Sequence, residues 1–379
     1  MQLLIIGNPE NRRVVGFAQA AAAGGLSTRI IAHEELVSEP DRLCELPDVP
    51  TTLVRIDSAG ENARVETMLL GQGYQDVLEY GAHAISPDEL AAREPLRGEV
   101  LCPRQYHLGF TRYMKRLESI FAARPAWRIL NPPESILRMF NKNDSMETYR
   151  RMGISVPPSL PNISTPDELR TSMADRGIHS VYVKLTCGSS ASCLGVFSWR
   201  RGNRPSLMTT LRKTDSGYFN SLRIQRIDDT DHVESVLAFL LREGCRVEES
   251  MPKSRRDSAF MDCRVLVIDG RACFQVVRES PHPITNLHLG GRRGDLASLR
   301  NRIGEQAWGE ALLQAEKVWS AHDCFHVGVD LMFDPGFSRS TIIESNAFGD
   351  LLPGLQYQGR SVYEHQVEVL KRKYSSHGA

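Results

Sequence analysis

Three oxygen-bearing side chains in the last third of the chain could together hold a metal ion. Asp330 lies in an apolar, β-patterned run at 327–333, and Glu344 and Asn346 end a second such run that begins at Ser340. Alternate side chains of a strand lie on one face, so on two paired strands all three can converge. Carboxylate and amide oxygens suit a Mg²⁺ ion that also carries nucleotide phosphates. These residues therefore predict a magnesium site and phosphate chemistry.

The alternative is a pair of strands that merely carries acidic surface residues. Asp330 argues against it, because Val329 and Leu331 flank it and an unpaired carboxylate is costly to bury in an apolar run. A metal ion or a cationic partner would remove that cost. The sequence therefore favours a binding site over an acidic surface.

A second stretch has the composition of a phosphate-binding loop. Lys184 opens a run of small residues that extends to Gly195, includes Ser189 and Ser190, and separates two β-patterned segments. Backbone N–H groups of such a loop can point at phosphate oxygens while the ammonium group supplies positive charge. The same composition also occurs in plain hairpin loops, so that alternative stays open.

Size, charge and cysteine usage limit the class of protein. The 379 residues are enough for two or three domains. The 46 basic and 46 acidic residues cancel, so no overall field attracts nucleic acid or an anionic membrane. The apolar run at 3–6 is too short to cross a bilayer and lacks the charged region of a signal peptide. Eight scattered cysteines without a CxxC pair indicate reduced thiols, so we expect a cytoplasmic protein that binds neither nucleic acid nor membrane.

The start of the chain alternates short apolar strands with helices, which predicts a parallel α/β sheet. The strands are expected at 3–6, 28–32 and 52–56. Ligands of such sheets bind beyond the carboxyl ends of the strands. Polar residues at those ends could bind a ligand, or could only cap helices and turns. They are Asn8, Arg55, Asp57 and Ser58. No GxGxxG follows the first strand, which argues against a dinucleotide site.

Further along, turn signals divide the chain. A proline-rich turn at 131–135 starts a helix that is expected to run unbroken to Gly153. Two β-patterned runs, at 263–268 and 272–277, flank the turn Asp269-Gly270-Arg271. Asp-Gly between two such runs is a strong signal for a β-hairpin.

The order of several polar residues is more informative than any one motif. The series begins with Lys142, eleven residues before Gly153, and continues with the loop at 184–195 that Lys184 opens. Glu248, Glu249 and Met251 then follow a helix, and Asp262 and Arg264 stand at the start of a strand. Arg278 and Asn286 lie beyond that strand, and the three predicted metal ligands end the series. This order resembles the ATP-grasp superfamily, in particular the branch of ribosomal-protein glutamate ligase and bacterial glutathione synthetase. The resemblance covers about residues 126 to 356, and the whole chain is similar to a bacterial subgroup of that superfamily.

The resemblance implies an N-terminal parallel α/β domain followed by a two-lobed α+β ATP-grasp fold. The implied divisions are 1–125 for the N-terminal domain, 126–240 for the central lobe with its phosphate-covering loop, and 241–379 for the C-terminal lobe with the metal and substrate residues. ATP would lie between the two lobes.

The resemblance also implies how ATP is held. Lys142 and Lys184 would neutralise its phosphates, and Ser189 and Ser190 belong to the loop that would cover them. The three predicted metal ligands would hold Mg²⁺, for which Mn²⁺ could substitute, between the β- and γ-phosphates.

Residues of the nucleoside pocket follow from the same resemblance. Main-chain groups from Glu249 to Met251 would bind adenine at the hinge between the lobes, with Glu248 nearby. Asp262 stands where relatives bind the ribose hydroxyls.

The implied reaction joins a carboxylate to an amine. In such ligases the carboxylate attacks the γ-phosphate to give an acyl phosphate, which the amine captures, so that ADP and phosphate are released. Arg264, Arg278 and Asn286 match the positions that stabilise the developing negative charge. The chain is therefore expected to be an ATP-dependent ligase acting on a peptide or an amino acid-like substrate.

The chain departs from the family pattern in two places. Leu185 follows Lys184 where a proline is usual, and the loop that follows has fewer glycines. Phe348 stands two residues after Asn346 where relatives often have a proline. Four basic residues near the substrate residues could bind an acidic substrate or could simply be solvated. They are His282, His288, Arg292 and Arg293.

Two other functions remain open. Some ATP-grasp proteins phosphorylate a hydroxyl group and stop, so a small-molecule kinase is the first. The second is a nucleotide-binding partner without turnover, which the altered loop and the missing proline would suit. A homodimer is compatible with the sequence.

Overall fold

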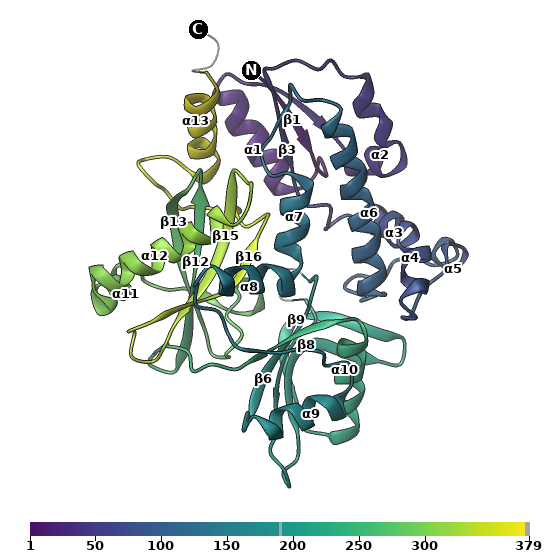
Figure 1. Cartoon of the computed structure of the whole chain (residues 1–379), viewed down its shortest axis with the longest axis vertical. Coiled ribbons are helices and arrows are strands. Elements are labelled where there is room, and N and C mark those ends of the chain that lie inside the picture. The colour runs from purple at the N-terminus through teal and green to yellow at the C-terminus, as the bar shows by residue number, and fades with distance from the viewer. Residues whose placement is uncertain (189–191, 376–379) are drawn as a thin grey trace.

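Three β-sheets organise the part of the chain that the structure, a computed structural model, describes, namely residues 1–188 and 192–375. The N-terminal sheet lies at one end of the long axis, the central sheet at the other end, and the C-terminal sheet between them (Figure 1). This mixed architecture, with one parallel and two antiparallel sheets, confirms the predicted fold class.

The N-terminal unit is a parallel sheet with helices on both faces. Its elements are β1 (Gln2–Ile6), α1 (Arg12–Ala23), β2 (Ser27–Ile31), α2 (His33–Ser38), the 3₁₀ turn η1 (Pro40–Glu45), β3 (Thr52–Ile56), α3 (Ala63–Gln72), α4 (Tyr74–Glu79), α5 (Pro87–Ala91), α6 (Pro103–Ala122), β4 (Arg128–Ile129) and, from the other end of the chain, α13 (Val362–Ser375). The strand order is β2-β1-β3-β4. Leu3 and Ile5 of β1 pack with α1 and α13, whereas Leu4 and Ile6 pack with α3 and α6. Burial on both faces explains the unbroken apolar run of β1.

Two short helices replace the single helix expected between the turn at 131–135 and Gly153. They are α7 (Pro133–Phe140) and α8 (Lys142–Arg151). Asn141 between them has an extended backbone, and its side-chain oxygen accepts the N–H groups that begin α8. The expected unbroken helix is therefore wrong, because asparagine competes for the backbone and caps a new helix. The break makes Lys142 the first residue of α8.

The central lobe is an antiparallel sheet covered by two helices. It contains β5 (Ser159–Leu160), α9 (Pro166–Asp175), β6 (Ser180–Leu185), β7 (Leu194–Ser198), β8 (Ser206–Thr214), β9 (Gly217–Ile227), α10 (Thr230–Arg242) and β10 (Cys245–Glu249). The strand order is β5-β10-β6-β7-β8-β9. Leu169 of α9 and Leu240 of α10 pack with Val181 and Phe197 of the sheet.

The C-terminal lobe is a second antiparallel sheet. It contains β11 (Arg255–Arg256), β12 (Ala259–Ile268), β13 (Arg271–Ser280), the 3₁₀ turn η2 (Leu287–Leu289), β14 (Arg292–Arg293), α11 (Leu296–Ile303), α12 (Glu305–Ser320), β15 (His326–Phe333) and β16 (Ser340–Asn346). The strand order is β14-β13-β12-β15-β16, with β11 on β12. The predicted hairpin is confirmed: Asp269 and Gly270 join β12 to β13 with φ of 47° and 79°, as a two-residue hairpin turn requires.

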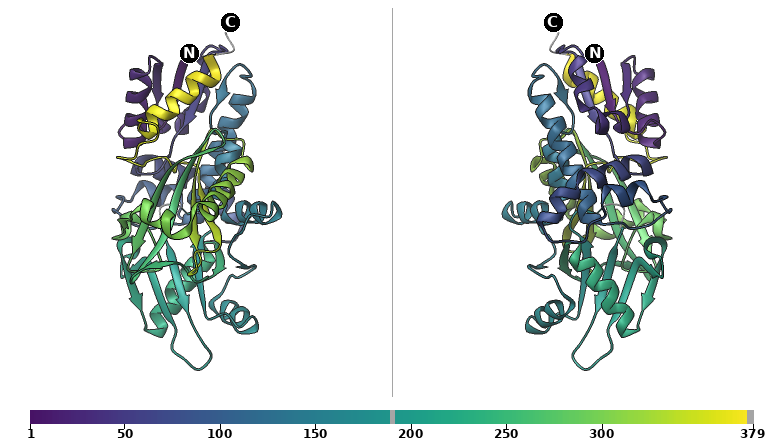
Figure 2. Two further views of the ribbon diagram at one scale, coloured as in Figure 1. Left: turned by 90° about the vertical axis from the view of Figure 1, so that its left-hand side faces the viewer. Right: turned by 90° about the vertical axis from the view of Figure 1, so that its right-hand side faces the viewer.

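The C-terminal lobe and the N-terminal unit share buried surface. Figure 2 shows α13 lying along α1, where the Phe17 and Tyr363 rings meet edge to face with centroids 5.8 Å apart. Lys371 Nζ donates to Gly24 O at 3.0 Å. The chain thus returns to its first unit, and the division at residues 125 and 240 stays a prediction.

The cysteines and the helices bear on two further expectations from the sequence. All eight cysteines are free thiols, as expected. Among the described residues, no helix has the length and apolar character needed to cross a membrane.

Candidate active site

The three predicted metal ligands lie close together on two neighbouring strands. Asp330 of β15 stands directly opposite Glu344 of β16, and Gly328 stands opposite Asn346. Residues paired across an antiparallel ladder carry their side chains on one face. All three predicted ligands line one cavity. The structure therefore brings them together, and a register shift between Asp330 and Leu331 is what sets Glu344 opposite Asp330.

Two arginines hold Asp330, whose side chain is only 6% exposed. Arg264, its cross-strand neighbour on β12, binds both carboxylate oxygens, and Arg278 Nη2 lies 3.2 Å from Oδ1. Burial alone would raise the pKa of Asp330, but the two arginines outweigh it and lower the pKa to about 2. The carboxylate is therefore ionised at neutral pH, and the arginines offset the cost of burying it.

The donor set fits a magnesium ion whose coordination is completed by a ligand. Asp330 and Glu344 offer carboxylates and Asn346 offers an amide oxygen, all of them hard donors. Nowhere in residues 1–188 and 192–375 do three or more His, Cys, Asp or Glu side chains gather in a way that could hold a metal. An ion at this place would therefore need further oxygens, which nucleotide phosphates supply.

Lys142 links the acidic strand to the loop that follows β6. Its backbone N–H donates to Thr186 O at 3.0 Å, which fixes the start of α8 against that loop. Its ammonium group lies 3.2 Å from Glu344 Oε1 and donates to the carbonyl of Gly188. This arrangement suits a cation that neutralises a phosphate bound beside Glu344.

A buried carboxylate fixes the second predicted lysine. Lys184 on β6 and Arg246 on β10 each place a nitrogen 2.5 Å from an oxygen of Glu248. Burial would raise the pKa of Glu248, but the charges of these two cations lower it. Glu248 therefore positions Lys184 in the wall of the cavity.

The segment predicted to bind adenine connects the two lobes. Glu249 and Met251 line the same cavity as the metal ligands. The N–H groups of Glu249 and Ser250 donate to Pro158 O and Ser180 O, at 2.9 and 3.0 Å. These two N–H groups thus stabilise the hinge, and adenine recognition would use other groups of this wall.

Asp262 is enclosed by donors from the protein. Arg278 binds its two oxygens at 2.7 and 2.9 Å, and Thr285 Oγ1 donates to Oδ2. Lys253 Nζ lies 3.7 Å away, and the Asp262 side chain is 1% exposed. In this arrangement Asp262 positions Arg278 instead of offering an oxygen to a ribose. Lys253 also lines the cavity, and our sequence analysis missed it although it lies two residues after Met251.

Two cavities meet at the predicted reaction centre. The smaller one, of about 100 Å³, is lined by the residues predicted for the nucleoside and by Lys184. The larger one is a cleft of about 860 Å³ that Lys142 and the N-terminal unit line. Five residues line both cavities: Arg264, Arg278, Asn286, Glu344 and Asn346. The predicted loop residues Ser189 and Ser190 lie outside the described part of the chain.

Solved structures share this architecture, although no protein-family model matches the sequence and no curated protein matches it either. D-cycloserine synthetase DcsG is 12% identical, and the match covers 98% of this chain and 99% of that chain with a TM-score of 0.54. A Chryseobacterium gregarium RiPP-associated ATP-grasp ligase, in complex with ADP and a leader and core peptide, is 13% identical over 98% of this chain and 97% of that chain, with a TM-score of 0.54. The ATP-grasp ligase PsnB, with a minimal precursor, Mg and ADP, is 13% identical over 98% and 97% of the two chains, with a TM-score of 0.51.

This chain has the ATP-grasp fold. The resemblance inferred from the order of polar residues is thereby confirmed at the level of the superfamily fold. The branch within the superfamily stays a prediction.

The four basic residues that the sequence offered as possible ligands of an acidic substrate differ in their surroundings. His288 lines the large cleft, and its backbone N–H donates to Asn286 Oδ1 at 2.8 Å. Arg292 binds Glu279 at 2.9 Å, and Arg293 donates to a backbone carbonyl at 2.6 Å. The two arginines thus have partners in the protein, and His288 is better placed to meet an acidic substrate. His282 is not among the residues that line the cleft.

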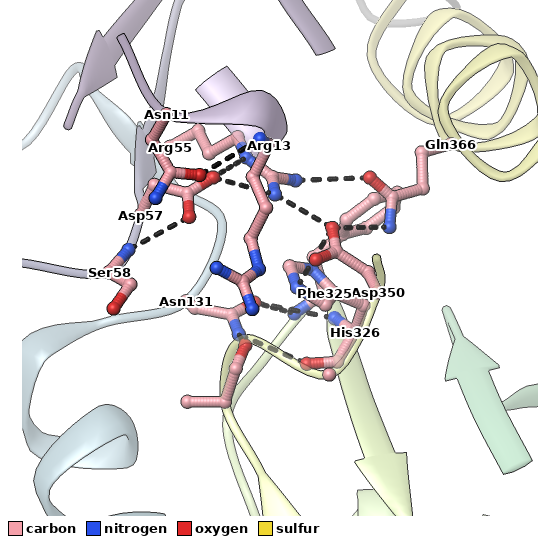
Figure 3. A network of polar contacts seen from close by, with 12 residues as sticks. Asn11, Arg13, Arg55, Asp57, Ser58, Asn131, Phe325, His326, Asp350 and Gln366 are labelled. Carbon is pink, nitrogen blue, oxygen red and sulfur yellow. Dashed lines mark hydrogen bonds and ion pairs between the residues drawn. The ribbon is translucent and has the colours of Figure 1, made fainter. Parts of the chain in front are cut away.

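A buried ion network ties the C-terminal lobe of the ATP-grasp fold to the N-terminal unit (Figure 3). Arg55 Nη2 lies 3.0 Å from Asp57 and 2.7 Å from Asp350, and Nη1 donates to Gln366 at 3.0 Å. Burial would raise the pKa of Asp350, but the Arg55 charge holds it well below its usual range. Asp350 follows Asn346 by four residues, so the network fixes the loop that leaves β16. Arg55 and Asp57 therefore bind protein groups, not a ligand.

One residue that our sequence analysis missed reaches the cleft from α1. Arg13 lines the 860 Å³ cleft, and its buried Nε has no hydrogen-bond partner among the described residues. In Figure 3 no dashed line reaches its guanidinium group. Asn8, at the carboxyl end of β1, was predicted as a possible ligand-binding residue, but its side chain donates to the carbonyls of Ala59 and Gly60. Arg13 lies five residues beyond Asn8, where strand position alone gives no signal.

Proposed function

We propose that the protein is an ATP-dependent carboxylate–amine ligase that forms an amide bond through an acyl phosphate. The observation that carries the proposal is the meeting of two cavities at Arg264, Arg278, Asn286, Glu344 and Asn346. ATP that extends from the smaller cavity into the part of the cleft beside Lys142, and a carboxylate in the rest of the cleft, would meet there. A protein that only binds nucleotide has no need of the second cleft.

The site would take ATP with Mg²⁺, and the solved PsnB complex contains ADP and Mg. Lys142 and Lys184 would neutralise the phosphates from either side. Asp330, Glu344 and Asn346 would hold the Mg²⁺ ion, which offsets phosphate charge during transfer. Asp330 and Glu344 are paired across β15 and β16 and line one cavity, which supports this assignment.

The reaction would proceed in two steps. A carboxylate oxygen of the substrate attacks the γ-phosphorus, and the bond to ADP breaks. The amine then attacks the acyl carbon, loses a proton, and phosphate leaves. Asn286 lies at the junction of the two cavities, where both steps would take place.

Arg264 and Arg278 would stabilise the negative charge that develops on the oxygens. Ion pairs already hold both guanidinium groups, with Asp330 and with Asp262. Donors that are fixed in advance need no reorganisation during the reaction. Asp262 therefore acts as a positioning residue.

The carboxylate substrate would be a peptide or an amino acid-like molecule. The cleft volume of about 860 Å³ lies toward the upper end of small-molecule sites. PsnB and the Chryseobacterium ligase were solved with a minimal precursor and with a leader and core peptide. We also propose 1–125, 126–240 and 241–379 as the functional units, and residues of all three line the proposed substrate cleft, among them Arg13, Lys142 and Arg264.

The test is the release of ADP and phosphate from Mg²⁺ and ATP, with sets of carboxylic acids and peptides, in the presence and absence of amines. A ligase releases ADP over many turnovers only when both a carboxylate and an amine are present, because the amine removes the acyl phosphate formed in the first step. Glu344→Gln should lower turnover by about 100-fold or more, as for the loss of a transition-state contact. The control Glu305→Gln removes a carboxylate that is 73% exposed and should leave turnover unchanged.

Two results would contradict the proposal. Release of AMP and pyrophosphate would exclude the acyl-phosphate route. A stable phosphorylated product formed without any amine would identify a kinase instead.

A further inference from the structure

Four aromatic side chains form one wall of the large cleft. The ring centroids of Phe110 and Phe140 are 5.3 Å apart, and those of Phe140 and Phe348 are 5.8 Å apart. Tyr106 lies one turn before Phe110 on the same face of α6. All four residues line the cleft. We call Tyr106, Phe110, Phe140 and Phe348 the aromatic wall.

The aromatic wall begins beside the proposed reaction centre. Phe348 lies two residues after Asn346, and Phe140 lies two residues before Lys142. The loop that carries Phe348 is fixed further along by the ion pair of Asp350 with the N-terminal unit. A carboxylate held at the junction of the two cavities would therefore direct its substituent along this wall.

Core packing does not account for the whole aromatic wall. Phe110 is 3% exposed and belongs to the core, whereas Phe140, Phe348 and Tyr106 pack against that core, stay partly exposed and border the cleft. Leu70 lines the same cleft and extends its apolar surface. Apolar surface next to a few convergent charged groups is typical of a pocket that binds an amphipathic ligand.

We propose that the carboxylate substrate carries an aromatic or large apolar side chain, which binds against the aromatic wall. The inference rests on the proposed ligase function and adds the class of its substrate. Aromatic rings attract one another in edge-to-face geometry, and burying an apolar group is favourable. A charged side chain would lose its hydration against these rings and would be disfavoured. Phe348 is then a residue that determines specificity.

The experiment compares three small acids as probes by calorimetry, with the protein loaded with Mg²⁺ and a non-hydrolysable ATP analogue. The probes are 3-phenylpropionate, propionate and glutarate. We expect 3-phenylpropionate to bind at least about 10-fold more tightly than the other two, as for several buried carbons in an apolar pocket. Phe348→Ala should remove most of that preference, and Phe348→Leu should keep more of it. Thermal unfolding and binding of the ATP analogue show that each variant is folded.

The matched control is Leu222→Ala, which removes an apolar side chain of β9 that is 66% exposed and does not line the cleft. It should leave the preference unchanged. Equal binding of the three acids, tighter binding of glutarate, or an unchanged preference in Phe348→Ala would overturn the inference.

Turnover separates this inference from the proposed function. Hydroxylamine captures an acyl phosphate as a hydroxamate, so it can replace the unknown amine. Selective binding of 3-phenylpropionate without any hydroxamate from any acid would support the aromatic wall and count against a ligase. Hydroxamate formation without preference for the phenyl acid would support the ligase and overturn the aromatic wall.

Discussion

Replacing Asp350 by asparagine tests the buried network between the C-terminal lobe and the N-terminal unit. Asp350 lies 2.7 Å from Arg55 Nη2 and accepts a hydrogen bond from Gln366 at 3.2 Å, and its side chain is 0% exposed. The substitution leaves Arg55 with Asp57 as its remaining carboxylate. Removing one partner of a buried ion pair costs about 3–5 kcal/mol. Because Asp57 stays and asparagine can still accept a hydrogen bond, we expect the free energy of unfolding to fall by about 3 kcal/mol.

The assay is urea unfolding of the whole protein, with Asp41→Asn as the matched control. Asp41 pairs with Arg116, but their side chains are 68% and 51% exposed. Losing such a surface pair should change the free energy of unfolding by less than about 1 kcal/mol. A loss in Asp350→Asn that is no larger than the loss in Asp41→Asn would refute the reasoning that burial makes this network stabilising.

Three further predictions concern pH and ligand binding. The folded-state pKa values of Asp330 and Asp350 lie below the unfolded value of about 3.9, so their contribution to stability is complete above that value and is lost as the pH falls through the folded values. The urea midpoint should therefore fall between about pH 5 and pH 2, and it should fall less in Asp350→Asn. Glu248→Gln should raise KM for ATP by about 10-fold, because Lys184 loses the carboxylate that positions it. Arg13→Gln should raise KM for the carboxylate by about 10-fold and leave KM for ATP unchanged, because its guanidinium faces the cleft.

Each of these predictions has an outcome that contradicts it. A urea midpoint that falls equally in Asp350→Asn and in the wild type would mean that Asp350 does not contribute to the pH dependence. An unchanged KM for ATP in Glu248→Gln would mean that Lys184 is held in place without Glu248. A rise in KM for ATP in Arg13→Gln would place this arginine on the nucleotide side.

The closeness of the predicted metal ligands follows in part from local geometry, whereas the roles of the site residues stay predictions. Glu344 and Asn346 alternate along β16, so period two puts them on one face, but a register shift between Asp330 and Leu331 is needed to set Glu344 opposite Asp330. The turn at Asp269 and Gly270 is equally local, because both residues must adopt positive φ. The alternation along β16 and the hairpin turn, which depend only on neighbouring residues, were thus predicted correctly.

Features that depend on contacts between distant residues were not predicted. The strands β8 and β9 were not predicted, because buried threonines interrupt the apolar pattern of β8 and almost all residues of β9 are exposed or half-buried. The side chain of Asn141 caps the new helix α8, but an asparagine at this place could also have stayed inside one continuous helix, and the sequence does not decide between the two. The network of Arg55 with Asp350 joins residues 295 positions apart, and Phe348 lies 208 positions after its contact Phe140, so no local pattern reveals either.

The central claim is that a substrate carboxylate attacks the γ-phosphate at the junction of the two cavities. The most direct measurement uses whichever carboxylate supports ADP release, labelled with ¹⁸O, and analyses the released phosphate by mass spectrometry. A ligase that forms an acyl phosphate transfers one labelled oxygen to each phosphate. Unlabelled phosphate released together with amide product would contradict the claim.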